Sequence, residues 1–220
     1  MKKTLFVLML LLGSAIYADK GDKDDVFLPA TNVLSTYLMK PTLGGEQLKS
    51  SFLYGIGFDI PMYRYLTASW GFKFGKFTRT TVPEVYSLLG NSVWNFMGDL
   101  SFKAQYPFEF AKQHLIPYLG ASVGLNVFVD NQAIENLAMG QLYNPDSGIK
   151  SVAPLGLGPC GSGFAGIEYF PYPLIGIFAE AGYQTMYLTA RMVDKVGTTW
   201  NFKNQVFLSP MINFGIKIAL

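Results

Sequence analysis

The 220-residue chain contains one cysteine and one histidine. A disulfide needs two thiols, and the usual zinc sites need several His or Cys ligands, so the sequence excludes both. Charged residues make up only 15% of the chain, and lysine and arginine form no basic cluster. A nucleic-acid-binding function depends on such clusters and is not expected. The sequence also gives no sign of a cofactor.

The chain lacks an apolar run long enough for a transmembrane helix, which needs about 20 residues. Its longest run, Leu5–Leu12, has eight residues; it follows Lys2 and Lys3 and precedes the small residues of 13–18. This order is typical of a secretory signal peptide covering residues 1–18. Removing it takes away two of 17 basic and none of 15 acidic residues, which leaves a net charge of 17 − 2 − 15 = 0.

What the chain does contain is period-two alternation, the pattern of β-strands with two different faces. In the clearest segment, bulky residues alternate with small or polar ones: Leu66, Ala68, Trp70, Phe72 and Phe74 against Thr67, Ser69, Gly71, Lys73 and Gly75. The same alternation recurs in six further segments, at 51–60, 94–106, 119–129, 161–170, 175–184 and 212–220. Seven strands are therefore predicted.

The bulky apolar face and the small polar face indicate which side of the sheet is enclosed. A soluble barrel places its large apolar side chains inside, whereas a lipid-facing barrel places them outside. Here the enclosed face is the small polar one, so the alternation predicts a transmembrane barrel. Single-chain bacterial barrels have an even strand number, and residues 32–40 are the only room for an eighth strand.

The connections alternate between short and long, as in outer-membrane barrels with short periplasmic turns and long outer loops. Short links are expected at 61–63, 107–114 and 171–174, and long ones at 41–49, 77–93, 130–159 and 191–203. Proline lacks the donor of a strand ladder, so a bulge at Pro210, or a strand that begins at Met211, is expected.

The aromatic residues fall into two bands, one near the short turns and one near the long loops. Tyr118 and Phe170 are counted with the first band, and Phe77 and Trp94 with the second. Aromatic rings favour the headgroup level of a bilayer, so the two bands agree with a membrane-spanning barrel.

At 117–125, and again at 57–60 running into 65–74, the chain resembles the small bacterial outer-membrane β-barrels, the group around the OmpA membrane domain, OmpX and OmpW. The resemblance implies an all-β fold: an eight-stranded antiparallel up-and-down transmembrane β-barrel over residues 19–220, of which 19–31 form a flexible polar leader. It also implies an outer-membrane location and insertion by the outer-membrane assembly machinery. The family usually ends in an aromatic residue, whereas this chain ends in Leu220.

The polar faces place seven charged residues in the lumen. They are Asp59, Lys73, Asp99, Lys103, Glu168, Glu180 and Lys217. Charges at membrane depth need partners or water, and we expect Lys73 near Asp99 and either Glu168 or Glu180 near Lys217. Eight strands leave room for little besides side chains, so an ionic plug is expected; a solute-selecting filter is the alternative.

No catalytic site is expected. Glu168 and Glu180 lie on neighbouring strands and could be an acid/base pair, but no substrate pocket is indicated at that depth. His114 is expected in a periplasmic turn without the partners of a catalytic triad, and Cys160 as an inert small residue. We therefore predict a non-enzymatic protein.

The segment 130–159 is long and unusually apolar for a surface loop. Its apolar residues include Leu137, Met139, Leu142 and Tyr143. We expect it to cap the barrel mouth, with a short helix near 132–139, or else to expose a contact patch.

The sequence leaves three functions open. The first is a structural or surface-interaction role, with outer-membrane lipid as one partner and surface partners bound through the loops at 77–93 and 130–159. The second is an OmpW-like conduit for small apolar solutes. The third is a soluble periplasmic ligand-binding barrel of the lipocalin type.

Overall fold

The structure is a computed structural model of the chain. It describes residues 30–41, 48–80, 91–110, 113–131, 134–135, 151–152, 155–196 and 199–220. The expected signal peptide and almost all of the expected leader lie outside these residues. No helix in the described part of the chain is long and apolar enough to span a membrane.

The described residues form ten β-strands. They are β1 (Thr31–Met39), β2 (Ser51–Tyr63), β3 (Leu66–Thr78), β4 (Ser92–Gln105), β5 (Phe108–Phe110), β6 (Gln113–Val129), β7 (Ser151–Val152), β8 (Leu155–Tyr172), β9 (Ile175–Val196) and β10 (Thr199–Ala219). Eight are long, and β5 and β7 are short additions that pair with β6 and β9.

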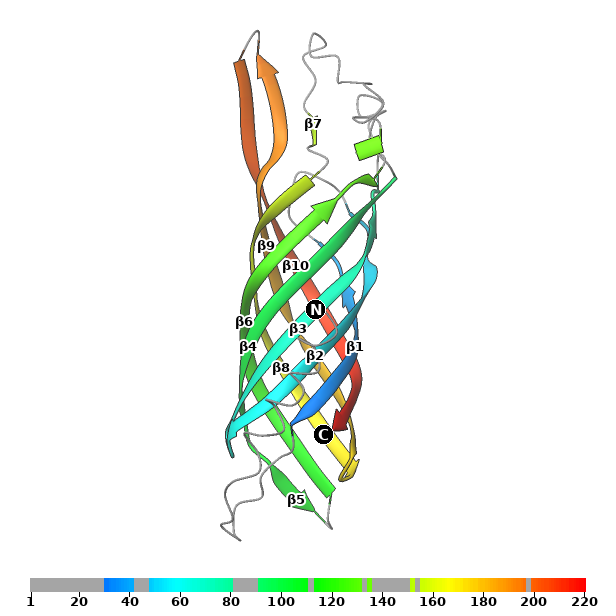
Figure 1. Cartoon of the computed structure of the whole chain (residues 1–220), viewed down its shortest axis with the longest axis vertical. Helices are drawn as coiled ribbons and strands as arrows, with labels where there is room; N and C mark the ends of the chain where they lie inside the picture. The colour runs from blue at the N-terminus through cyan, green and yellow to red at the C-terminus, as the bar shows by residue number, and fades with distance from the viewer. Residues whose placement is uncertain are drawn as a thin grey trace, which may run out of the picture.

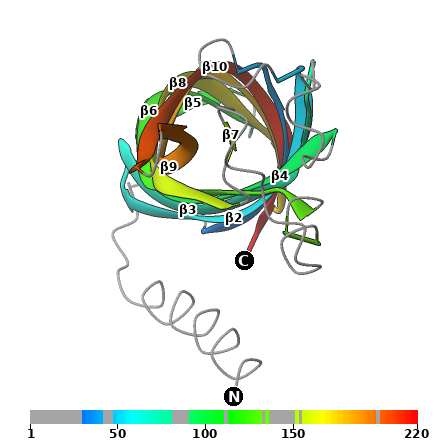
Figure 2. The same cartoon turned by 90° about the horizontal axis from the view of Figure 1, so that it is seen from above.

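The eight long strands form a closed antiparallel barrel, which confirms the expected fold (Figures 1 and 2). Each strand pairs with the next along the chain, in the order β1-β2-β3-β4-β6-β8-β9-β10, and β10 pairs back with β1. Closure leaves no long edge within the barrel wall, so the backbone groups there are satisfied by neighbouring strands.

The expected first strand is present as β1, although its alternation is weak in the sequence. Nine consecutive residues pair with β10 on one side and with β2 on the other. Ser35 and Tyr37 face the lumen, and Leu34 points outward with 51% of its surface exposed. This strand closes the barrel.

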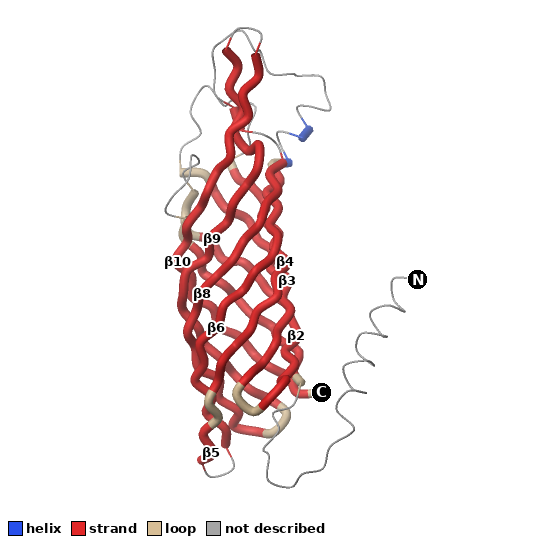
Figure 3. The backbone as a smooth tube through the Cα atoms, turned by 90° about the vertical axis from the view of Figure 1, so that its left-hand side faces the viewer, coloured by secondary structure: helices blue, strands red, loops and turns tan. Residues whose placement is uncertain are grey.

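Two short links differ from expectation. β2 continues through Pro61 to Tyr63, and the turn lies at 64–65. The segment expected as a link at 107–114 contains β5, which pairs with the first residues of β6 and extends below the barrel wall (Figure 3). His114 is therefore in a strand and not in a turn.

Two predictions near the long loops are wrong. The expected loop at 191–203 is a β-hairpin: β9 and β10 remain paired up to Val196 and Thr199 and rise above the rest of the barrel (Figure 1). β10 also runs through Pro210, with no register shift there; the one irregularity of the β9–β10 ladder lies between Lys203 and Gln205.

Pro210 is tolerated because of its place in the ladder. It lies one residue beyond the last paired residues of β1 and β10, Met39 and Met211, and its carbonyl accepts a bond from the Lys40 amide at 3.3 Å. The missing N–H would point to that same end of β1. Proline therefore removes only a terminal bond, and the pairing of Pro210 with Tyr183 of β9 continues.

The outer wall of the barrel is apolar over its whole circumference. Large side chains from all eight long strands are exposed there, among them Leu34, Ile56, Trp70, Leu100, Val123, Ile167, Ile177 and Phe214. Exposed Tyr63, Tyr65, Tyr106, Phe108 and Tyr172 lie near the short turns, as expected. A belt of this size is far larger than a soluble monomer exposes, so its neighbour is lipid and not water.

Candidate functional site

The lumen of the barrel contains all seven charged residues that the alternation placed there. Each is at least nine-tenths buried. A buried charge is stable only when other groups of the protein compensate it, so the arrangement of these residues decides what the lumen can do.

Four of the seven form a closed ring of alternating charge. Lys103 Nζ lies 2.9 Å from Asp59 Oδ2 and 3.7 Å from Glu168 Oε1. Lys217 forms ion pairs with the same two carboxylates. The ring residues come from β2, β4, β8 and β10, which are alternate strands around the barrel. The ring therefore ties together opposite sides of the wall and carries no net charge.

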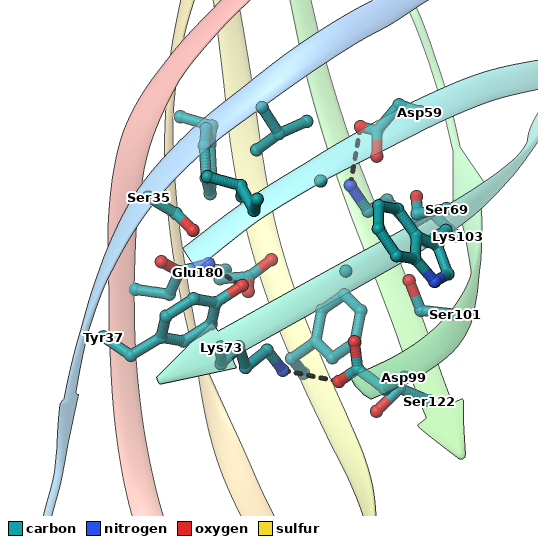
Figure 4. A pocket seen from close by; sticks show the side chains of 18 of the residues that line it. Ser35, Tyr37, Asp59, Ser69, Lys73, Asp99, Ser101, Lys103, Ser122 and Glu180 are labelled. Atoms are coloured by element: carbon teal, nitrogen blue, oxygen red, sulfur yellow. Dashed lines mark hydrogen bonds and ion pairs between the residues drawn. The ribbon is translucent and has the colours of Figure 1, made fainter. Parts of the chain in front are cut away.

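A separate ion pair lies beside the ring. Lys73 Nζ is 2.6 Å from Asp99 Oδ2, as expected from the sequence (Figure 4). Lys73 also lies over the ring of Tyr37, 4.6 Å from its centroid. The ammonium thus has a carboxylate and an aromatic face as neighbours, both of which favour the cation.

Glu180 differs from the other three carboxylates in its partners. It accepts a hydrogen bond from the Tyr118 hydroxyl at 2.9 Å and one from the Asn213 amide at 2.6 Å. Of the two alternatives expected for Lys217, the structure confirms Glu168. With three lysines and four carboxylates, the excess negative charge of the network resides at Glu180, where neutral donors stabilise it.

Local glycine placement makes the Tyr118 contact possible. Gly166 of β8 pairs with Tyr118 of β6 on one side and with Glu180 of β9 on the other. A Cβ atom on Gly166 would lie 2.5 Å from the Tyr118 hydroxyl and ring. The missing side chain therefore lets the phenol pass over β8 and reach Glu180 two strands away.

Above the charges, toward the long loops, the lumen is filled by apolar side chains. Phe77, Phe128 and Phe207 are fully buried and stack with nearly parallel rings; the centroids of Phe77 and Phe128 are 6.0 Å apart, and those of Phe128 and Phe207 are 5.5 Å apart. The stack is surrounded by Met39, Leu53, Val93, Met97, Met186, Leu188 and Met211. We call these ten residues the apolar layer.

Further contacts lie at both ends of the lumen. On the long-loop side, buried Arg79 and Asp130 form an ion pair with 2.6 Å between Nη1 and Oδ2. On the short-turn side, Thr67 donates to the Gln105 side chain at 2.8 Å, and Ile116 packs with Phe170. Between the ends, a cavity of about 50 Å³ adjoins Lys73, Asp99 and Glu180. That volume holds roughly three water molecules.

The seven lumen charges form a packed polar core. Glu168 belongs to the ring and Glu180 to the Tyr118–Asn213 contact, so the two do not act as a pair on a common pocket. Cys160 is buried. Among the described residues, no three His, Cys, Asp or Glu side chains are grouped to hold a metal ion.

Comparison with solved structures identifies the fold. No protein-family model and no curated protein sequence matches the chain. The outer membrane protein OprG from Pseudomonas aeruginosa superposes with a TM-score of 0.54 at 10% identity, over 87% of this chain and 96% of that one. The outer membrane protein AlkL, solved in lipid bilayers, superposes with a TM-score of 0.50 at 12% identity, over 92% and 95%. The fold is that of the small outer-membrane barrels.

The outer-membrane barrel fold agrees with the surface of the chain. Its strands carry the exposed apolar belt, and the seven charges assigned to the lumen are enclosed, so the face assignment made from the alternation is confirmed. The soluble lipocalin-type alternative requires the reverse arrangement and is not supported.

The expected contact residues in the long loop cannot be placed. Leu137, Met139, Leu142 and Tyr143 lie outside the described residues. Of the expected helix at 132–139, the structure describes only residues 134 and 135, where the Ile134 amide bonds to the Asp130 carbonyl. β8 begins at Leu155, so the loop is shorter than expected.

Sequence reasoning missed the aromatic filling of the lumen. Tyr118, Phe170 and Phe77 were assigned to the membrane interfaces but are buried inside. The signal that finds Phe77 and Tyr118 is the alternation carried past the expected strand ends, whereas Phe170 already lies inside the expected strand 161–170 and has the parity of Glu168. Phe77 has the parity of Lys73 in β3, and Phe128 and Tyr118 have that of Ser122 in β6.

Proposed function

We propose that this protein is a non-conducting, non-enzymatic barrel of the outer membrane that holds its long loops at the cell surface. The observation that carries the proposal is that the ionic ring and the apolar layer fill the lumen and leave a cavity of about 50 Å³ beside Lys73, Asp99 and Glu180. A barrel filled in this way serves as an anchor, and its interaction sites would lie in the connections between β3 and β4 and between β6 and β8, which the sequence placed at 77–93 and 130–159. Insertion by the outer-membrane assembly machinery belongs to the same proposal.

Planar-bilayer recording tests the plug. The purified protein should give no discrete conductance in symmetric salt, whereas replacing Phe77, Phe128 and Phe207 together by alanine should produce brief openings through the weakened apolar layer. The matched control replaces three outward aromatics, Phe52, Phe102 and Phe214, by alanine and should stay silent. Steady ion conductance by the unmodified protein would contradict the proposal.

A conduit for small apolar solutes is the second candidate, and the apolar layer is the observation that favours it. The layer lies at the long-loop end, where a solute would enter, and it contains the flexible side chains of Met39, Met97, Met186 and Met211, which can repack around a guest. Uptake of an aliphatic fluorescent probe into proteoliposomes tests it. Uptake no faster than into protein-free liposomes would exclude this function.

A further inference from the structure

Three lysines lie on the outside of the barrel at the long-loop end of adjacent strands. Lys40 follows β1, Lys49 precedes β2, and Lys76 lies near the end of β3; all three side chains are exposed. The pattern is unusual because the other charged side chains that the structure describes in the eight long strands point into the lumen.

The strand register brings the three lysines together. The Lys49 amide bonds to the Thr78 carbonyl at 2.8 Å, which places Lys49 two residues from the position of Lys76 on the neighbouring strand. On the other side of β2, Met39 of β1 pairs with Ser51. Lys40, the next residue after Met39, therefore lies at about the same height on the wall as Lys49 and Lys76. Diagonal neighbours on adjacent strands have their Cβ atoms within about 8 Å, so long lysine side chains can converge on one ligand.

We call these three residues the lysine patch. Their neighbours indicate their depth in the bilayer. Lys76 pairs with Trp94 of β4, and its ammonium lies 5.8 Å from the centre of the indole. Directly below lie Phe74 and the exposed Phe52 of the apolar belt. Tryptophan marks the headgroup level of a bilayer, so the patch lies where lipid phosphates are found.

Among the side chains that the structure describes, the charge around the patch is one-sided. Where the structure describes the side chain, only two other charged residues are exposed: Arg64, at the opposite end in the turn between β2 and β3, and Glu135, in the segment after β6. No acidic side chain that the structure describes on the wall lies next to the three lysines. The three cations therefore repel one another, and an anion bound between them relieves that repulsion.

We propose that the lysine patch binds the phosphate of an outer-leaflet glycolipid of the lipid A type. The inference rests on the proposed placement in the outer membrane, with the long loops outside. The apolar wall below the patch packs against the acyl chains, Trp94 lies at the glycan level, and the ammonium groups of Lys40, Lys49 and Lys76 contact the phosphate.

Native mass spectrometry of the full protein in zwitterionic detergent, titrated with bisphosphorylated lipid A, tests the assignment. The variant K40Q/K49Q/K76Q should bind about 100-fold more weakly, because each lysine at a charged lipid surface contributes about a fivefold factor. Arg64→Gln removes the same charge at the other end of the barrel and should bind as the unmodified protein does. Equal binding by the triple variant would overturn the proposal, as would an equal loss in Arg64→Gln.

Two further measurements identify the ligand chemistry. Lipid A without phosphate should bind the unmodified protein as weakly as bisphosphorylated lipid A binds the triple variant. Phosphatidylglycerol should bind more weakly than lipid A; equal binding would show a general anionic-lipid surface and overturn the assignment to the glycolipid. The variant K40R/K49R/K76R keeps the charge and should retain binding, which separates charge from fold. None of these outcomes depends on whether the lumen conducts.

Discussion

Tyr118 and Glu180 are joined by a 2.9 Å hydrogen bond although two strand spacings separate their backbones. The phenol spans Gly166, the residue that lies between them on β8. Cross-strand contacts usually join adjacent strands. Here the Tyr118 side chain reaches past β8 to Glu180. Among the four carboxylates of the lumen network, Glu180 is the one whose hydrogen-bonding partners, Tyr118 and Asn213, are neutral.

Tyr118→Phe should therefore destabilise the barrel. The substitution leaves the ring in place and removes one donor from a buried carboxylate, a loss of about 1–3 kcal/mol in the free energy of unfolding. Urea unfolding in detergent, followed by tryptophan fluorescence, measures it. Tyr106→Phe is the control, because Tyr106 is exposed at the outer wall; an equal loss in both variants would contradict the role assigned to Tyr118.

The ionic ring should behave as a coupled unit. Lys217→Met leaves Asp59 and Glu168 with one lysine between them and should cost about 3–5 kcal/mol. Adding Glu168→Met restores neutrality with Asp59 and Lys103 still paired, so the double variant should be more stable than the sum of the single losses indicates. A double-mutant cycle from unfolding midpoints gives the coupling, and strict additivity would mean that the ring residues act independently.

Phe128 is the centre of the aromatic stack, so its removal should be costly. Phe128→Ala leaves a cavity in the apolar layer and should lower the free energy of unfolding by about 3–5 kcal/mol. Phe102→Ala, on the lipid-facing wall, leaves no internal cavity and should cost less when measured in the same detergent. The proteins can be compared by unfolding midpoint and by heat-modifiable gel mobility; equal losses would argue against a packed lumen.

The two faces of β6 can be distinguished by spin labels. In a Cys160→Ser background, a nitroxide at Val123, which is 68% exposed, should be accessible to oxygen dissolved in the bilayer. A nitroxide at Ser122, which is buried and bonds to Ser162 of the adjacent strand β8, should be shielded from oxygen and from a water-soluble relaxant. Reversed accessibilities would mean that the faces are assigned the wrong way round.

An outward charge gives a further check on the wall. Phe72→Arg places a guanidinium against lipid near the middle of β3 and should cost about 2–4 kcal/mol if it lies at the bilayer midplane. Ser69→Arg points into the lumen beside Asp59, where the carboxylate can compensate the charge, and should cost less. The ratio of folded to unfolded bands on unheated gels distinguishes the two variants.

The barrel was predictable because period two is a strong signal when one side of a sheet meets lipid and the other is enclosed. Lys73 and Asp99 could even be paired from their registers. The limits of the strands were harder to locate. Pro210 interrupts the sequence pattern but not the ladder, because its missing donor falls where β1 ends. The hairpin above 191 stays paired up to Val196 and Thr199, although the sequence there carries no clear alternation.

The filling of the lumen could not be read from residue type alone. An aromatic ring is favourable at a membrane interface and also inside a narrow barrel, so Tyr118 and Phe77 fit either place. Whether a residue is an even or odd number of positions from a known lumen residue decides between the interface and the lumen. That count can be used only when the strand is known to extend as far as the residue. The partners of Glu180 were beyond prediction for another reason, since Tyr118 reaches it across an intervening strand and not by direct pairing.

The ionic ring has a consequence for how the cylinder is completed. Lys217 belongs to the final strand and Asp59 to the second, and their ion pair crosses β1, next to the seam where β10 meets it. Before β10 pairs with β1, Lys103 is the one ring lysine within reach of Asp59, whereas Glu168 can already pair with Lys217 across β9. The last ion pair of the ring, Lys217 with Asp59, thus forms together with closure, which favours the finished cylinder over a nearly complete, open-sided intermediate.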